Sequence, residues 1–139
     1  MKNILIIVLS GFALCGCSKK ETAKHYPKDT LVFSGYASPD SACESFTWAV
    51  SKGDKAVILQ SMAPAARDGF EKHLAGKTDA QIKEEITKGM GFPGYTVQKR
   101  EIISDDEVIL DIMVDGADQI QKMDLKKIGS EWKLDDPKS

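Results

Sequence analysis

The sequence is poor in the residues that most often carry chemistry. It has 3 cysteines and 2 histidines in 139 residues, which leaves little material for metal sites or for several disulfides. Lysine plus arginine number 19 against 21 acidic residues, so a net charge of −2 offers no cationic surface on which to gather phosphates. We therefore expect no nucleic-acid partner. The length suits one globular domain.

Histidine is equally scarce inside the expected domain, because His25 belongs to a polar segment near the N-terminus. His73 has no partner at metal-ligand spacing, so neither a zinc site nor a nucleophilic triad is predicted. The acidic turns at residues 105–107 and 115–118 lack the twelve-residue calcium loop with its terminal glutamate. We predict no metal and no other cofactor.

No hydrophobic run is long enough to cross a bilayer. The longest, residues 4–14, follows Lys2 and falls short of the roughly 20 apolar residues that a transmembrane helix needs. It ends in Leu14-Cys15-Gly16-Cys17, which resembles the lipobox of bacterial lipoproteins, where an aliphatic residue and two small residues precede a cysteine. The resemblance implies that residues 1–16 are a signal peptide and that Cys17 is the first residue of the mature chain.

The chemistry of lipidation explains why a cysteine must stand at this position. The sulfur of Cys17 is nucleophilic enough to take a diacylglyceryl group as a thioether, and cleavage then frees an amine that can be acylated. Each buried methylene stabilises the anchor by about 0.8 kcal/mol, so two or three chains hold the protein in the membrane. The alternative is a secreted protein cleaved at an A-x-A-like site, but residues 10–20 contain none.

The lipobox resemblance also bears on location and on cysteine pairing. Ser18 stands where an aspartate would imply inner-membrane retention, so the resemblance implies an outer-membrane anchor facing the periplasm in a Gram-negative host. With Cys15 removed and Cys17 capped, only Cys43 remains, so no internal disulfide is possible. Residues 17–30 are polar and rich in lysine, and we interpret them as a flexible tether to a single domain at residues 31–139.

Helical patterns fill the first half of that domain. Ser38-Pro39-Asp40 combines a capping residue, a proline at the first helical position and an acidic residue at the positive end of the helix dipole. Apolar residues then recur at helical spacing up to Gly53. Three further helices are expected at residues 54–62, 64–76 and 78–89.

The second half of the domain follows a strand pattern. After Pro93 the apolar period changes from about 3.6 to 2, and Val108, Leu110 and Ile112 share one face. Strands are expected at residues 95–104, 107–114, 119–128 and 132–134. The patterns together predict an α+β fold, with N-terminal helices packed on a curved antiparallel sheet of three to four strands.

This order of elements is similar to that of small bacterial lipoproteins of unknown function with a nuclear-transport-factor-2-like domain. The resemblance rests on the Gly53-Asp54 helix junction and on the closing segment with Gly129, Trp132 and Leu134, and it covers residues 38–136. It implies a cone, as in cystatin-like folds, in which a strongly bent sheet surrounds the first helix. The helical stretch at residues 65–89 is longer than in the compact form of that fold.

The same resemblance suggests where chemistry would be found. Some members of the superfamily are isomerases or cyclases with a general base or a tyrosine in the cone, and Asp111 and Tyr95 would be the candidates here. The alternation of the strand places Asp111 opposite Leu110, however, which favours a surface carboxylate. We single out Trp48 and Tyr95 as candidate ligand-binding residues, because large aromatic side chains often line apolar cavities.

These observations favour a non-enzymatic, lipid-anchored protein of the cell envelope. Its partners would be the membrane, through Cys17, and a small-molecule ligand or an envelope protein held by the domain. Two alternatives stay open: an isomerase- or cyclase-like enzyme that uses the cone, and a structural adaptor in a membrane assembly complex.

Overall fold

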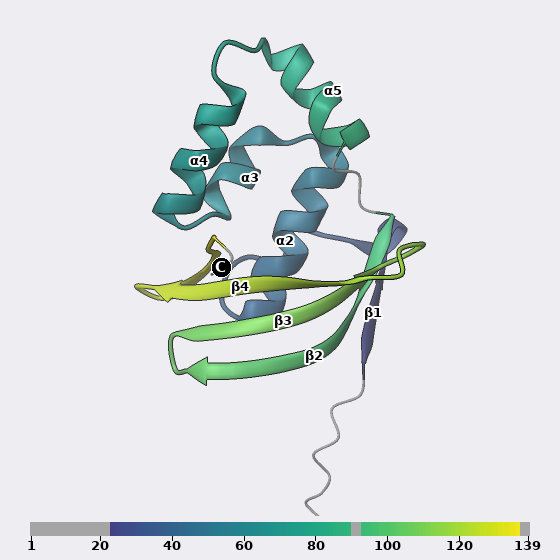
Figure 1. The fold of residues 1–139 in the computed structure, drawn as a ribbon, viewed down its shortest axis with the longest axis vertical. Helices are drawn as coiled ribbons and strands as arrows, with labels where there is room; N and C mark the ends of the chain where they lie inside the picture. The colour runs from purple at the N-terminus through teal and green to yellow at the C-terminus, as the bar shows by residue number, and fades with distance from the viewer. Residues whose placement is uncertain (1–22, 90–92, 137–139) are drawn as a thin grey trace, which may run out of the picture.

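A computed structural model describes residues 23–89 and 93–136, and Figure 1 shows the fold. Cys17 and the expected signal peptide lie outside the described residues. After one short strand come the helices and then the other strands of an antiparallel sheet, so the predicted α+β class is confirmed. The elements are β1 (Lys24–Pro27), the 3-10 helix η2 (Lys28–Thr30), α2 (Pro39–Lys52), α3 (Lys55–Gln60), α4 (Pro64–Leu74), α5 (Asp79–Gly89), β2 (Gly94–Ser104), β3 (Glu107–Val114), β4 (Ile120–Ile128) and β5 (Glu131–Leu134).

Helix α2 begins and ends where its capping residues predict. The Ser38 side chain accepts a hydrogen bond from the Ser41 N–H at 3.1 Å, and Pro39 occupies the first turn. Gly53 closes the helix with φ 67°, a left-handed conformation that glycine adopts without strain. The helix buries seven residues, so it forms the centre of the core.

The shorter helices are capped in the same way. The Asp54 carboxylate accepts from the Val57 N–H at 3.2 Å at the start of α3. Before α5, Thr78 and Gln81 form a reciprocal capping box, with N–H to side-chain distances of 2.9 and 3.2 Å. All four helices predicted between residues 38 and 89 are therefore present, within a few residues of the expected ends.

The sheet has five strands in the order β1-β2-β3-β4-β5, all antiparallel, so the expectation of three to four strands is wrong. The extra strand is β1, which lies in the segment expected to be tether and pairs with β2 from Lys24↔Val97 to Pro27↔Gly94. Its Tyr26 is buried and stacks on Tyr95, with ring centroids 4.8 Å apart. The ordered domain thus includes the last seven residues of the expected tether, residues 24–30.

The curled sheet forms a half-barrel, and α2 lies across its concave side (Figure 1). The far edge of β5 is covered by loops rather than by a strand. The Trp132 N–H donates to the Tyr36 carbonyl at 2.9 Å, and the Leu134 N–H donates to the Ser61 carbonyl at 2.8 Å. These bonds place α3 and the start of α4 beside the sheet, above the end of β5.

Candidate functional site

A cavity of about 630 Å³ lies between helix α4 and the β4–β5 side of the sheet. Its walls come from α2, α4, β3, β4 and the chain after β5, together with the turn between α3 and α4. The lining residues are Phe46, Met62, Ala66, Gly69, Phe70, His73, Val114, Gln121, Lys122, Met123, Asp124, Leu134, Asp135 and Asp136.

Helix α4 supplies one wall because four of its residues share a face. Ala66, Gly69, Phe70 and His73 follow the i, i+3, i+4, i+7 spacing, so they line up along one side of the helix. Leu74 is the one residue of α4 in the buried class, while Ala66 and Phe70 are partly buried and pack against the core. The same face of the helix therefore contacts the core and borders the cavity.

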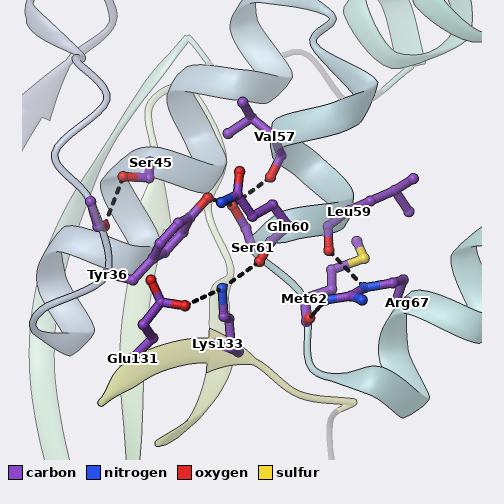
Figure 2. Close-up of polar contacts among 11 residues, drawn as sticks. Tyr36, Ser45, Val57, Leu59, Gln60, Ser61, Met62, Arg67, Glu131 and Lys133 are labelled. Carbon is purple, nitrogen blue, oxygen red and sulfur yellow. Dashed lines mark hydrogen bonds and ion pairs between the residues drawn. The ribbon is translucent and has the colours of Figure 1, made fainter. Parts of the chain in front are cut away.

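The turn between α3 and α4 is held by Arg67, as Figure 2 shows. Its guanidinium donates to the Leu59 carbonyl at 3.0 Å and to the Met62 carbonyl at 3.2 Å. Carbonyls at the end of a short helix have no partner within that helix, and a planar cation can satisfy two at once. Arg67 thus fixes Met62 and the start of α4 relative to the sheet.

A buried lysine joins the same turn to β5 (Figure 2). The Lys133 Nζ donates to the Gln60 carbonyl at 2.7 Å, lies 3.2 Å from a carboxylate oxygen of Glu131, and stands 4.0 Å from the centroid of the Tyr36 ring. These partners compensate the charge that burial removes from water. The Tyr36 hydroxyl in turn lies 3.1 Å from the Ser61 hydroxyl, so this polar cluster ties the loop, α3 and β5 together.

Three of the five ionisable side chains that line the cavity are carboxylates. Its two basic groups already pair with carboxylates that do not line it: Lys122 with Asp111 at 2.9 Å, and His73 with Glu85. On the acidic side stand Asp124, Asp135 and Asp136, of which Asp135 has the exposed Lys126 3.7 Å away. The cavity therefore joins apolar walls to a negative rim.

The far end of α4 is fastened to α5 by charge. Glu85 contacts both Lys77 and His73, and hydrogen bonds from these two side chains hold the pKa of the Glu85 carboxyl below its ordinary value, with Lys77 the larger influence. Because His73 also lines the cavity, this contact links a residue of the cavity wall to α5.

The predicted ligand residue Tyr95 is a core residue. It is fully buried, stacks on Tyr26, and has its hydroxyl in contact with Thr47 and Cys43. Burial raises the pKa of Tyr95, so the phenol stays neutral and cannot serve as a base. Tyr95 does not line the described cavity.

Trp48, the other predicted ligand residue, is half-buried on α2. Its ring meets Phe33 edge-on at 5.9 Å, and Phe33, which is 46% exposed, also meets the ring of Tyr36. Trp48 does not line the described cavity either. Its role in ligand binding stays a prediction.

The residues considered for catalysis are not brought together. Asp111 pairs with Lys122 and lies outside the cavity, Tyr95 lies in the core, and His73 lines the cavity from α4. Within residues 23–89 and 93–136, no group of three or more His, Cys, Asp or Glu side chains is placed to hold a metal ion. The lipidation candidate, Cys17, lies outside the described residues.

The cavity was not predicted from the sequence, because the residues that form its walls follow the same apolar pattern as ordinary core residues. Phe46, Met62, Phe70 and Leu134 each fit the apolar face of a helix or strand, and nothing local marks a face that meets empty space. The sequence signal that could have indicated the cavity is Gly69, a glycine inside a helix. A larger side chain at this position would enter the cavity.

Three comparisons place the chain among known proteins. No curated protein and no solved structure matches it. In the part of the chain that the structure describes, no helix has the length and apolar character needed to span a bilayer. A family model for a domain of unknown function, DUF4878, matches residues 32–135, from just after η2 to the residue that follows β5. The chain therefore belongs to the DUF4878 family.

Proposed function

We propose that this protein is a lipid-anchored binding protein of the cell envelope, without catalytic activity, that holds the apolar part of a ligand in the cavity beneath α4. The observation that carries the proposal is the cavity itself. Its volume of about 630 Å³ falls within the range of about 300–1,000 Å³ typical of ligand sites. Apolar walls with a few polar groups at the rim are also typical of such sites.

The charged groups at the rim of the cavity restrict the charge that the ligand can carry. Both basic groups of the lining are already paired, and Asp135 has Lys126 3.7 Å away, so Asp136 contributes most to the negative potential at the mouth. An anionic ligand would meet repulsion there, whereas a neutral or cationic one would not. The ligand is therefore apolar at one end and uncharged or positive at the other.

The anchoring part of the proposal is supported by the N-terminal sequence and by the position of β1. Leu14-Cys15-Gly16-Cys17 supplies the lipidation pattern, and β1 begins at Lys24. Residues 17–23 then span at most about 25 Å. We further propose that the half-barrel is a nuclear-transport-factor-2-like cone, which is supported by a long first helix within a strongly curled sheet.

The cavity is tested at Gly69, where an added Cβ would meet no heavy atom within 4 Å. The lipid-free mature chain, residues 17–139 with Cys17→Ser, is titrated with the neutral fluorescent probe N-phenyl-1-naphthylamine. We expect Gly69→Trp to fill the cavity and to weaken probe binding at least tenfold. Gly69→Ala is the matched control, because it keeps the cavity open. Equal binding by the two variants would refute the site.

Anchoring is tested separately in the native host. We expect labelled palmitate to enter the wild-type protein and the protein to fractionate with membranes. A Cys17→Ala variant should take up no label and should leave the membrane fraction. If that variant is still processed and retained in the envelope, the lipoprotein proposal is wrong.

A further inference from the structure

The cavity meets the edge of strand β4 and not one face of it. Successive side chains of a strand point to opposite faces of the sheet, so a cavity over one face would be lined by alternate residues. Here four consecutive residues line it: Gln121, Lys122, Met123 and Asp124. That pattern arises where a hollow borders the backbone edge of the strand.

In the part of the chain that the structure describes, this edge is open over the first four of the nine residues of β4. On one side β4 pairs with β3 from Ile120 to Lys126. On the other side β5 pairs only from Leu125 onward, and the Asp135 N–H then donates to the Asp124 carbonyl at 2.9 Å. Among the described residues no strand pairs with residues 120–123 on that side.

The hydrogen-bond pattern identifies which backbone groups face the open side. In an antiparallel ladder the N–H and C=O of one residue point to the same side, and successive residues alternate. The Asp124 carbonyl points toward the β5 side, because it accepts from Asp135. The N–H and C=O of Lys122 and Ile120 therefore point into the open side, toward the cavity.

Strand β5 ends at Leu134, before it reaches this stretch. Continuing the register of Leu125↔Leu134 would bring residue 137 opposite Lys122. That residue is Pro137, outside the described residues, and proline has no N–H to donate to the Lys122 carbonyl.

From these observations we propose that the open edge of β4 binds an extended segment of a partner protein as an added strand, an inference that rests on the proposed binding role of the cavity. Added strands gain affinity from backbone hydrogen bonds and specificity from alternate side chains. Apolar side chains on one face of the segment enter the hollow lined by Phe46, Phe70 and Met123. Basic side chains on its other face meet the acidic rim of the cavity at Asp136.

The test uses the full-length protein in phosphatidylcholine nanodiscs, with empty nanodiscs as the blank. The probe is a fluorescein-labelled octapeptide of alternating valine and lysine, followed by fluorescence polarisation. Two further peptides carry N-methyl groups on either the valine or the lysine amides, which blocks one edge of the peptide strand at a time. We expect the two methylated peptides to differ at least tenfold in affinity. Equal affinities would overturn strand addition, because binding through side chains alone is indifferent to which edge is blocked.

Variants at Lys122 test the edge from the protein side. Lys122→Pro removes the outward N–H, which faces away from β3, so the ladder with β3 is retained. Lys122→Ala is the matched control, since it loses the same side chain and the same ion pair with Asp111. We expect the proline variant to bind the octapeptide at least tenfold more weakly than the alanine variant. Equal binding would overturn the proposal.

The outcomes separate this inference from the proposed function. If the octapeptide fails to bind while the neutral probe still distinguishes Gly69→Trp from Gly69→Ala, the cavity binds ligands and strand addition is wrong. If neither the octapeptide nor the neutral probe is bound, both strand addition and the proposed binding function are wrong. Hydrogen exchange adds an independent readout, because strand addition should slow exchange at the Lys122 amide on peptide binding. If Lys122→Pro does not fold, the two methylated peptides still test strand addition with the wild-type protein.

Discussion

At the scale of single residues, burial decides the chemistry of Cys43. The thiol lies fully buried on α2 in the core cluster, next to the Tyr95 hydroxyl. Burial raises the pKa of the Cys43 thiol to about 12. A thiol reacts as its thiolate, so Cys43 is chemically inert in the folded protein.

This gives a prediction for thiol labelling. In the lipid-free mature chain with Cys17→Ser, Cys43 is the sole cysteine. At pH 8 we expect Ellman's reagent to leave the native protein unlabelled over the time in which the guanidinium-unfolded chain reacts completely. Labelling of the native chain at a rate comparable to that of the unfolded chain would show that the helix opens far more readily than its packing implies.

Tyr95 shows how a single residue can be misread from sequence. Its large ring near the start of a strand suggested a ligand contact. The partner that makes it a core residue is Tyr26, which lies in a segment whose composition is that of a polar tether. Because the two rings are far apart in the chain, no local pattern links them.

At the scale of elements, α2 and β1 mark the extremes of what sequence reasoning can predict. The bounds of α2 follow from Ser38, Pro39 and Gly53, all of which act locally. Strand β1 has four residues, one of them buried, and exists because β2 offers it an edge. Such a strand is defined by its partner, so a periodicity test on its own residues cannot find it.

The pairing of β1 with β2 depends on Gly94. This residue has φ 131°, and an added Cβ would lie 2.5 Å from an Asp115 carboxylate oxygen, 3.0 Å from the Tyr26 carbonyl oxygen and 3.1 Å from the Lys28 nitrogen. We expect Gly94→Ala to lower the free energy of unfolding by at least about 2 kcal/mol, measured by urea denaturation. Gly116→Ala is the control, since Gly116 has φ 86° but open space around it. If Gly94→Ala and Gly116→Ala lower the free energy of unfolding equally, backbone strain, and not contact with β1, determines the loss of stability.

The contact between α4 and α5 should make stability depend on pH. The pKa of Glu85 is lowered in the folded protein, first by Lys77 and then by His73. A carboxyl with a depressed folded pKa contributes stability that is present above its ordinary value near 4.5 and is lost as the pH falls below it.

We therefore expect Glu85→Gln to lower the Tm at pH 7 and to lower it progressively less as the pH falls below about 4.5, as followed by circular dichroism. Glu84→Gln is the control, because the ion pair of Glu84 with Lys88 is largely exposed and should contribute less. A Tm difference for Glu85→Gln that grows as the pH falls would contradict the assignment.

At the scale of the whole molecule, packing is uneven. Helix α2 buries seven residues against the sheet, whereas α4 buries only Leu74 and borders the cavity with much of its length. Regions with few buried apolar contacts open at lower free energy. The cavity could not be predicted from the sequence for the same reason: it is formed where several elements, each regular in itself, fail to fill the space between them.

This unevenness can be measured by native-state hydrogen exchange. We expect the amides of α4 to exchange at least tenfold faster than those in the middle of α2, because α4 can detach without unfolding the half-barrel. Gly69→Ala should slow exchange in α4, since replacing glycine inside a helix by alanine stabilises it by about 0.5–1 kcal/mol. Uniform exchange across both helices would mean that the domain opens only as a whole.

The order of the strands has one more consequence. In the proposed lipoprotein, the anchored end of the chain leads into β1, at one margin of the sheet, while the open backbone of β4 lies three strands away, about 14 Å across the sheet. A captured segment would therefore be separated from the strand next to the anchor by three strand spacings. Membrane attachment and recognition could then evolve independently, and exchanging the attachment for another should leave the choice of partner unchanged.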